Sequence, residues 1–385
     1  MEKTNSFKVT RINSLKLSNF RNHRNLNIET NKNFVLFYGP NGSGKTNVLE
    51  AISLLSSKTG FRSPNLISLV KDFDKNKIIE FGISAKLTID NNPTDIGVGL
   101  INKNDKITKY IKFQKNNSRK KLESILKIFW ILPDMNNLFQ SSSRKRRNFI
   151  DSMIASYNDQ HEKRIKIYEN LQKQRINILK GFSLTPKNNS WLDVIERKMA
   201  SQGVIICEKR MNLFESLNQI LLVKKENLPN VKIKSLCKIE EKLQTMPALK
   251  IEEEITSKLF DNRKIDGLIG KTRYSAINSD FKIDNLDKNT DAQNCSTGEQ
   301  KVILLSLFFS FIRLLKKYGI TRVIFLLDDI FSNLDNKYAE MILKSLWELD
   351  TQTWITDIGM NIIKKGSDLY RGTKFINIED IKMKN

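Results

Sequence analysis

Cysteine and histidine are scarce in this chain. Its 385 residues include three cysteines, Cys207, Cys237 and Cys295, and two histidines, His23 and His161. No CxxC pair occurs, whereas structural zinc sites draw four ligands from closely spaced residues of these two types. We therefore expect no structural zinc, no histidine-based acid–base chemistry and a reducing compartment.

Long hydrophobic runs are also lacking. The longest, Val302–Leu315, is interrupted by Ser306, Ser310 and Arg313 and is shorter than the roughly 20 residues that cross a bilayer. It is predicted to be a buried core helix. No apolar segment follows the charges of Met1–Lys8, as a secretory signal would require. These features predict a cytoplasmic protein without a membrane partner.

Acidic residues are few relative to basic ones. The 42 acidic residues face 65 lysines and arginines, which gives a net charge of +23. Such an excess suggests a polyanionic partner such as nucleic acid. Lysine is nevertheless abundant along the whole chain, and a general compositional bias would give the same charge without a binding face. The charge therefore needs support from motifs.

A phosphate-binding loop is present near the start of the chain. The run Gly39–Thr46 fits the pattern GxxxxGK[ST], between an apolar segment at 33–38 and helically spaced apolar residues at 48–55, which is the strand–loop–helix context that the pattern requires. Lys45 would reach the β- and γ-phosphates of ATP, and the Thr46 hydroxyl would bind Mg²⁺. The predicted nucleotide-binding residues are Gly39, Pro40, Asn41, Gly42, Ser43, Gly44, Lys45, Thr46 and Asn47.

An acidic strand near the other end of the chain complements this loop. Val323–Leu327 is apolar and is followed by Asp328 and Asp329. A carboxylate at the end of a buried parallel strand lies beside a phosphate loop, where Asp328 would orient Mg²⁺. Asp329 is then the candidate that polarises the attacking water. Lys45, Asp328 and Asp329 are the predicted catalytic residues.

A third motif, Ser296–Lys301, lies 32 residues before Asp328 (328 − 296). Ser296 and Glu299 have the spacing of a capping box ahead of the apolar helix, and a helix N-terminus is also an anion site. The motif stands 250 positions after Thr46 (296 − 46). This interval is long for a transporter ATPase subunit and short for the coiled-coil rod of an SMC chromosome organiser.

The segments between the motifs differ in character. Residues 78–113 predict antiparallel strands, with turns at 91–93 and 102–105, and residues 133–225 predict helices. A helix at 160–180, a polar break at 181–190 and a second helix after it would form an arm whose helices are each roughly 30 Å long. We expect an ATPase head from 1–130 and 270–385, and a helical lobe with this short arm from 131–269.

Together these residues resemble the ABC-ATPase superfamily and, within it, the RecF family of DNA replication and repair proteins. The matching segments occur in order along most of the chain: Leu17–His23, Asn41–Ile52, Leu132–Met135, Arg144–Asp151, Tyr168–Lys180, Ser296–Lys301 and Leu326–Asp329. The resemblance implies an α/β fold, with a parallel phosphate-loop core, antiparallel strands and a mostly helical second lobe with a short coiled-coil-like arm.

The resemblance also implies a site shared between two subunits. Its cofactors would be ATP and Mg²⁺. In an ATP-dependent homodimer, each nucleotide would lie between the loop of one subunit and Ser296, Thr297, Gly298 and Glu299 of the other. Arg62 and Arg21 would lie near the nucleotide, and Asp335 at the dimer seam. The implied function is binding to duplex DNA near gaps, at the nucleoid, to help load recombinase with RecO-like and RecR-like partners.

Four departures from the family pattern affect these expectations. Asp134 replaces a glutamine-type residue, Lys271 and Thr272 replace a Pro-His pair, and Asp357 stands where a histidine is expected. Asp329 replaces the glutamate that is common in ABC ATPases. Because aspartate is one methylene shorter, the attacking water would be held less well, and we expect slow ATP turnover stimulated by DNA.

Other functions remain open on the sequence alone. An SMC-type or ABC-type ATPase in chromosome organisation, without recombinase loading, is the main alternative. A nuclease with an ABC head would need a further acidic metal cluster, for which Glu340, Glu348 and Asp350 are scattered candidates. Two basic clusters are candidate DNA contacts, although a solvated helix face explains either equally well: Arg144–Arg147, and Lys115 with Arg119, Lys120 and Lys121.

Overall fold

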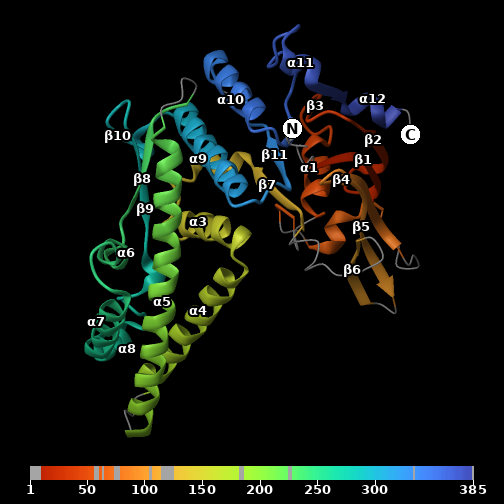
Figure 1. Cartoon of the computed structure of the whole chain (residues 1–385). Helices are drawn as coiled ribbons and strands as arrows, with labels where there is room; N and C mark the ends of the chain where they lie inside the picture. The colour runs from red at the N-terminus through yellow and green to blue at the C-terminus, as the bar shows by residue number, and fades with distance from the viewer. Residues whose placement is uncertain are drawn as a thin grey trace, which may run out of the picture. The chain divides into compact units, whose positions relative to one another are not determined.

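The computed structural model describes residues 10–55, 60–62, 65–72, 79–103, 106–113, 125–181, 186–223, 228–332 and 334–383. It separates into two units (Figure 1). The first unit consists of Met1–Asn136 and Leu315–Asn385, and the second of Asn137–Leu314.

A five-stranded parallel sheet carries the motifs of the first unit. Its order is β13-β3-β12-β11-β7, and every neighbouring pair is parallel. The strands are β3 (Phe34–Tyr38), β7 (Lys127–Ile131), β11 (Val323–Asp328), β12 (Gln352–Thr356) and β13 (Thr373–Asn377). Parallel strands covered on both faces are continuous apolar runs, and β11 and β12 are buried throughout. The carboxyl ends of β3, β12 and β11 therefore lie side by side.

An antiparallel sheet completes the first unit. Its order is β2-β1-β4-β5-β6, and its strands are β1 (Thr10–Phe20), β2 (His23–Glu29), β4 (Ile79–Ile89), β5 (Asn92–Lys103) and β6 (Lys106–Phe113). Asp90 and Asn91 link β4 to β5 with φ values of 49° and 67°, as a tight hairpin turn requires. The turn predicted at 102–105 falls partly outside the described residues.

One hydrophobic core joins the two sheets of this unit. Phe37, Leu326 and Trp354 contribute from the parallel sheet, and Leu15 and Ile83 from the antiparallel sheet. The remaining elements are α1 (Lys45–Ser53), η1 (Leu66–Leu69), η2 (Pro133–Asn137), α10 (Asn336–Glu348), α11 (Asp368–Gly372) and α12 (Ile378–Met383).

The second unit is mostly helical. Its helices are α3 (Ser143–Tyr157), α4 (Asp159–Lys180), α5 (Pro186–Leu221), α6 (Lys238–Leu243), α7 (Ala248–Asp261), α8 (Arg263–Ile269) and α9 (Thr297–Lys317), the last of which ends in the first unit. A small sheet of order β10-β9-β8 is formed by β8 (Val231–Ser235), β9 (Phe281–Asn285) and β10 (Thr290–Asp291), with short turns η3 (Ala276–Asn278) and η4 (Ala292–Asn294).

The arm is formed by α4 and α5, which pack along each other (Figure 1). The predicted extent of α4 is confirmed, but that of the second helix is wrong. Because α5 continues for 36 residues, its length is about 54 Å instead of roughly 30 Å. Its only proline, Pro186, stands at its first position, where it is tolerated.

The boundary of the predicted head also differs from the observed division. The first boundary, at 130/131, lies close to the observed change at Asn136. Residues 270–314, in contrast, belong to the second unit. The physical reason is strand pairing, since β9 pairs with β8 and so binds this segment to the second unit.

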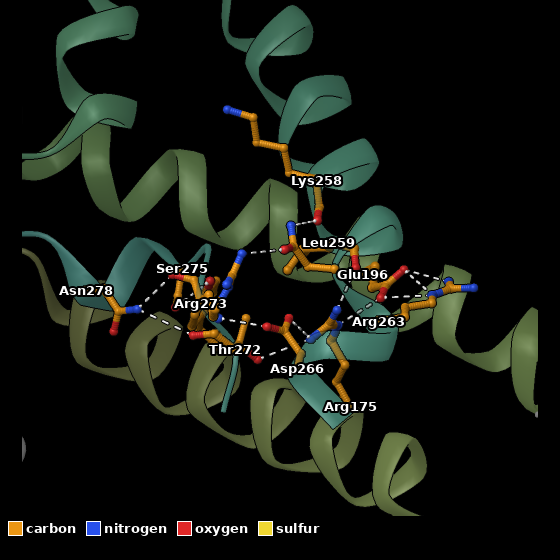
Figure 2. Close-up of polar contacts among 12 residues, drawn as sticks. Arg175, Glu196, Lys258, Leu259, Arg263, Asp266, Thr272, Arg273, Ser275 and Asn278 are labelled. Atoms are coloured by element: carbon orange, nitrogen blue, oxygen red, sulfur yellow. Dashed lines mark hydrogen bonds and ion pairs between the residues drawn. The ribbon is translucent and has the colours of Figure 1, made fainter. Parts of the chain in front are cut away.

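Buried charges hold the base of the arm together. Arg175 of α4 is fully buried, and its guanidinium donates to Glu196 Oε1 and Asp266 Oδ2, both at 2.8 Å (Figure 2). Arg175 also donates to the Leu259 carbonyl at 2.6 Å and to the Thr272 hydroxyl at 3.3 Å. Each buried charge of this network therefore has an opposite charge or a hydrogen-bond partner, as low dielectric surroundings demand.

The segment that departs from the family pattern at Lys271 and Thr272 is folded around this network. Thr272 is fully buried beside Arg175, and the backbone N–H of Arg273 donates to Asp266 Oδ1 at 3.1 Å (Figure 2). Lys271 is exposed. Thr272 thus has a structural role at the base of the arm.

Among the described residues, none of the helices combines the length and the apolar character that a membrane crossing would need.

Candidate nucleotide site

The candidate site lies entirely in the first unit, where three parallel strands end. The loop Gly39–Thr46 follows β3, Asp328 ends β11, and Thr356 ends β12. The register pairs Thr356 with Asp328 on one side and with Phe37 on the other. Because β12 lies between β3 and β11, motifs 282 positions apart in the chain (328 − 46) meet at one sheet edge.

The loop conformation depends on glycine. Gly39, Gly42 and Gly44 have φ values of 140°, 80° and 104°, which side chains with a Cβ rarely adopt. A Cβ on Gly44 would also come within 2.4 Å of Asn22 Nδ2. Gly44 is the N-cap of α1 and supplies no side-chain cap, so the first N–H groups of the helix are available to an anion.

Asn22, in the turn between β1 and β2, and His23, the first residue of β2, support the back of the loop. Asn22 donates to the Ser43 carbonyl at 3.3 Å and accepts from the Asn47 amide at 2.8 Å. His23 Nε2 lies 3.1 Å from the Gly44 carbonyl. The loop is therefore held in shape by side chains of the neighbouring hairpin, which the sequence motif does not reveal.

Asp328 is positioned by two hydroxyl groups. Thr46 Oγ1 donates to Asp328 Oδ1 at 2.9 Å, and Thr356 Oγ1 donates to the same oxygen at 2.7 Å. Burial raises the pKa of Asp328, and these two hydrogen bonds oppose the shift. Thr46 and Asp328, the two predicted Mg²⁺ ligands, thus lie within hydrogen-bond distance of each other, and Thr356 is a further residue at this position that the sequence prediction did not include.

Asp329 stands in a conformation that is rare for a residue with a side chain. Its φ is +49°, in the left-handed region that aspartate tolerates better than most residues. Its backbone N–H donates to Thr356 Oγ1 at 2.9 Å. Thr356 therefore connects the two acids, accepting from the backbone of Asp329 and donating to the carboxylate of Asp328.

Lys45 is folded back onto the loop. Its ammonium donates to the carbonyls of Gly39 and Pro40, at 2.6 and 2.9 Å. Burial lowers the pKa of Lys45, and the nearby carboxylates of Asp329, Asp357 and Asp328 act in the opposite direction. Among the described residues the charge thus has no direct hydrogen bond to a carboxylate, although four acids, the fourth being Glu379, act on it.

Two further polar groups at this edge lack partners. Ser43 Oγ and Asp357 Oδ2 are buried and have no hydrogen-bond partner among the described residues. Burial also raises the pKa of Asp357. An uncapped helix, an unpaired hydroxyl and a lysine held only by carbonyls together fit the phosphates of a nucleotide. Thr46 and Asp328 offer the hard oxygen ligands that Mg²⁺ prefers.

The predicted arginines occupy different positions. Arg62 is exposed and donates to Asn47 Oδ1 at 3.2 Å, beside the loop. Arg21 instead forms two 2.8 Å hydrogen bonds to Glu50, whose side chain is fully buried. Both arginines therefore help to neutralise a buried acid of α1, since Arg62 Nη1 also lies 3.7 Å from Glu50 Oε2, but the side chain of Arg62 is the more exposed of the two, at 45% against 21%.

The third motif lies in the second unit. Ser296 and Thr297 are exposed at the start of α9. The predicted capping box is confirmed, because the Ser296 N–H donates to Glu299 Oε2 at 3.1 Å and the Glu299 N–H donates to Ser296 Oγ at 3.4 Å. Lys288 also pairs with Glu299 and is the main cause of its lowered pKa.

The four basic residues of the run Arg144–Arg147, on α3, differ in their surroundings. Arg146 binds Asp280, with Nε 2.8 Å from Oδ1, whereas Arg144 and Lys145 are exposed. Arg147 is partly buried and donates to the Ser279 carbonyl at 2.8 Å. The second predicted cluster, Lys115 to Lys121, lies outside the described residues.

The cysteines are less isolated in space than in sequence. Cys207 of α5 and Cys237, the residue before α6, are buried and lie beside Glu240, with their ligand atoms within 4.8 Å of one another. Burial raises the pKa of Glu240 to about 8. The long separation in sequence gives no signal of this cluster.

Comparison with known proteins places these features in a family context. The model of the RecF/RecN/SMC N-terminal domain matches residues 11–377. The chain is 32% identical over 358 residues to a Rickettsia typhi protein described as DNA replication and repair protein RecF, covering 92% of this chain and 96% of that one. It is 30% identical over 354 residues to the protein of that description from Rickettsia rickettsii strain Sheila Smith, with the same two coverages.

Solved structures show the same fold. A structure of the recombination mediator protein RecF with ATPγS superposes with a TM-score of 0.76 at 23% identity, over 96% of both chains. The Smc head domain of Pyrococcus furiosus gives a TM-score of 0.52 at 16% identity, over 97% of this chain and 95% of that one. Both similarities confirm the predicted ABC-type head architecture.

Proposed function

The chain belongs to the RecF family, and from this premise we propose that it is an ATP-dependent DNA-binding protein of DNA replication and recombinational repair. The observation that carries the proposal is the convergence of Lys45, Thr46, Asp328 and Thr356 at one sheet edge. Relatives named as replication and repair proteins, and a structural neighbour placed in the RecFOR pathway, supply the cellular context.

The residues of the loop would bind the triphosphate of ATP. The N–H groups at the start of α1 and the Ser43 hydroxyl would donate to phosphate oxygens, and Lys45 would exchange the carbonyls of Gly39 and Pro40 for the phosphates. Mg²⁺, when bound, would neutralise the charge that develops during phosphoryl transfer. Thr46 and Asp328 would hold it, with Thr356 fixing the orientation of the Asp328 carboxylate.

Hydrolysis would depend on Asp329. The left-handed backbone conformation of Asp329 and the hydrogen bond from its N–H to Thr356 fix the position of its Cα. From that position the Asp329 carboxylate would accept a hydrogen bond from the attacking water. We propose that the short side chain makes turnover slow and that DNA binding stimulates it.

A complete site would require a second copy of the chain. In the proposed ATP-dependent homodimer, Ser296, Thr297, Gly298 and Glu299 of the partner close over the phosphates. The observed capping box supports this role, since an exposed hydroxyl at a helix N-terminus can change from capping its own helix to binding an anion. Duplex or gapped DNA and RecO-like and RecR-like mediators are the proposed partners.

The test is ATP hydrolysis by the whole protein with and without duplex DNA. We expect slow hydrolysis that rises when duplex is added. Lys45→Ala should abolish ATP binding, whereas Asp329→Asn should bind ATP and hydrolyse it at least about 100-fold more slowly. Rapid hydrolysis that is independent of DNA, or unchanged in Asp329→Asn, would contradict the proposal.

A further inference from the structure

A groove in the second unit is lined by basic side chains from separate elements. It has a volume of about 690 Å³ and lies among α3, α4, α5 and residues 270–278. Its basic lining residues are Arg144, Arg147, Lys173, Arg210 and Lys271. The first and the last of them, Arg144 and Lys271, are more than 120 positions apart in the chain. The fold therefore brings these side chains together.

Few carboxylates balance these charges. The acidic lining residues are Asp151 and Glu169. Asp151 is already engaged, because Arg210 donates to both of its oxygens, at 2.8 and 2.7 Å, and His161 Nε2 lies 2.9 Å from it. Four basic groups therefore remain against the single carboxylate of Glu169, which leaves an excess of positive charge inside a concave surface.

Arg147 shows the imbalance most clearly. Its guanidinium is partly buried, and its hydrogen bond within the described residues goes to a neutral acceptor, the Ser279 carbonyl. Burial and the charges of Arg210 and Arg144 lower its pKa, and they outweigh the opposite effect of the Asp280 and Asp151 carboxylates. The adjacent Arg146, in contrast, is fully matched by Asp280. An anion placed in the groove would give Arg147 the partner that it lacks.

We propose that this groove binds backbone phosphates of DNA. Arginine offers forked donors that match phosphate oxygens, and lysine offers a mobile point charge. The groove is far larger than one phosphate, and its free charges are spread over α3, α4 and the segment after α8, as contact with several successive phosphates would require. Contacts to phosphate carry no sequence information, so binding here is independent of DNA sequence.

This inference rests on the proposed DNA binding and identifies one surface responsible for it. The test is fluorescence anisotropy of a labelled duplex of mixed sequence with the full chain over a series of salt concentrations. The variant Arg147→Gln/Lys271→Gln removes two groove charges. The matched control Arg197→Gln/Lys198→Gln removes one arginine and one lysine that are exposed on α5 and do not line the groove.

The groove variant should bind duplex about 10- to 30-fold more weakly near physiological salt, and the slope of log K against log salt should fall by about 1.8, or about 0.9 for each lost contact. The control should stay within about twofold of wild type. Since Arg147 also holds the Ser279 carbonyl, the variant Lys173→Gln/Lys271→Gln, which changes only exposed side chains, should show the same loss without any change in folding.

Unchanged affinity and slope in both groove variants, with wild type binding duplex, would overturn the groove assignment alone. A wild-type protein that does not bind duplex would instead reject the proposed function. Titration with inorganic phosphate at constant ionic strength separates the two phosphate sources. Groove variants that lose phosphate binding and retain duplex binding would show that the ligand is a free anion, which would also overturn the proposal.

Discussion

The base of the arm and the nucleotide site both bury charges, but they differ in how those charges are paired. Arg175 meets two carboxylates at 2.8 Å, and it leaves neither of them without a cation. Within the described parts of the chain, Lys45 donates only to carbonyls, and Ser43 Oγ and Asp357 Oδ2 are buried without hydrogen-bond partners. The complete pairing around Arg175 fits a structural network, and the incomplete pairing at the sheet edge fits a site that binds a ligand.

The pKa shifts of the buried groups also differ between the base of the arm and the nucleotide site. In the network at the base of the arm, Arg263 donates from Nε to both carboxylate oxygens of Glu196 at 3.1 Å and from Nη2 to Asp193. Burial alone would lower its pKa, but these hydrogen bonds raise it, so the network favours the charged form. At the nucleotide site burial prevails, raising the pKa of Asp328 and Asp357 and lowering that of Lys45. Without ligands, burial thus shifts these three pKa values toward the uncharged forms of the side chains. Bound Mg²⁺ would favour the charged carboxylates, and bound phosphate would favour the charged lysine.

The largest expected effect comes from breaking the complete network. Arg175→Met leaves Glu196 and Asp266 buried without their central cation, which should lower the free energy of unfolding by about 3–5 kcal/mol. Urea unfolding followed by circular dichroism measures it. Arg197→Met, at an exposed position of α5, should change stability by less than about 0.5 kcal/mol. A loss below about 1 kcal/mol in Arg175→Met would show that the network is not structural.

Glu240 is a buried acid of the second unit, and its Oε1 has no hydrogen-bond partner among the residues that the structure describes. Its folded pKa of about 8 lies above its ordinary value of 4.5. As pH rises between these values the unfolded state releases the proton and the folded state keeps it, so the free energy of unfolding falls.

Glu240→Gln removes this penalty. Its stability relative to wild type should therefore increase from pH 5 to pH 8, by at most about 1.4 kcal/mol per pH unit. Denaturation at several pH values measures the difference, and Glu241→Gln, an exposed neighbour, should show no such trend. A difference between Glu240→Gln and wild type that does not depend on pH would contradict the predicted titration.

A smaller effect is expected at the nucleotide site from Thr356→Val. The substitution removes the hydroxyl that accepts from Asp329 and donates to Asp328, and should weaken Mg²⁺-dependent binding of a fluorescent ATP analogue by about tenfold, the equivalent of about 1.4 kcal/mol. Thr356→Ser should restore it. Equal affinity of the valine variant and wild type in the presence of Mg²⁺ would show that Thr356 does not position Asp328.

The motifs predicted one part of the site because their chemistry is written in consecutive residues. The loop at Gly39–Thr46 and the acids at Asp328 and Asp329 are of this kind, and the pairing of Thr46 with Asp328 confirms that the strands end together. Asn22, His23 and Thr356 were not predicted as site residues, because each acts through a neighbour in the sheet. For Thr356, its place at the end of the segment Gln352–Thr356, directly before Asp357, was an available signal.

Local sequence patterns likewise predicted only part of the fold. The parallel core, the antiparallel hairpin and α4 follow from local apolar patterns. The full length of α5 and the membership of residues 270–314 in the second unit do not, because they depend on packing of α5 against α4 and α7 and on pairing of β9 with β8. The convergence of Cys207, Cys237 and Glu240 likewise depends on which helices meet.

We propose above that the nucleotide site is divided between two subunits. Sedimentation velocity of wild type and Lys45→Ala, each with and without ATP and duplex DNA, tests this division. We expect a monomer without ATP, a dimer of wild type with ATP, and no ATP-dependent dimer of Lys45→Ala. A wild-type protein that stays monomeric with ATP and DNA, or an ATP-dependent dimer that forms equally well in Lys45→Ala, would contradict it.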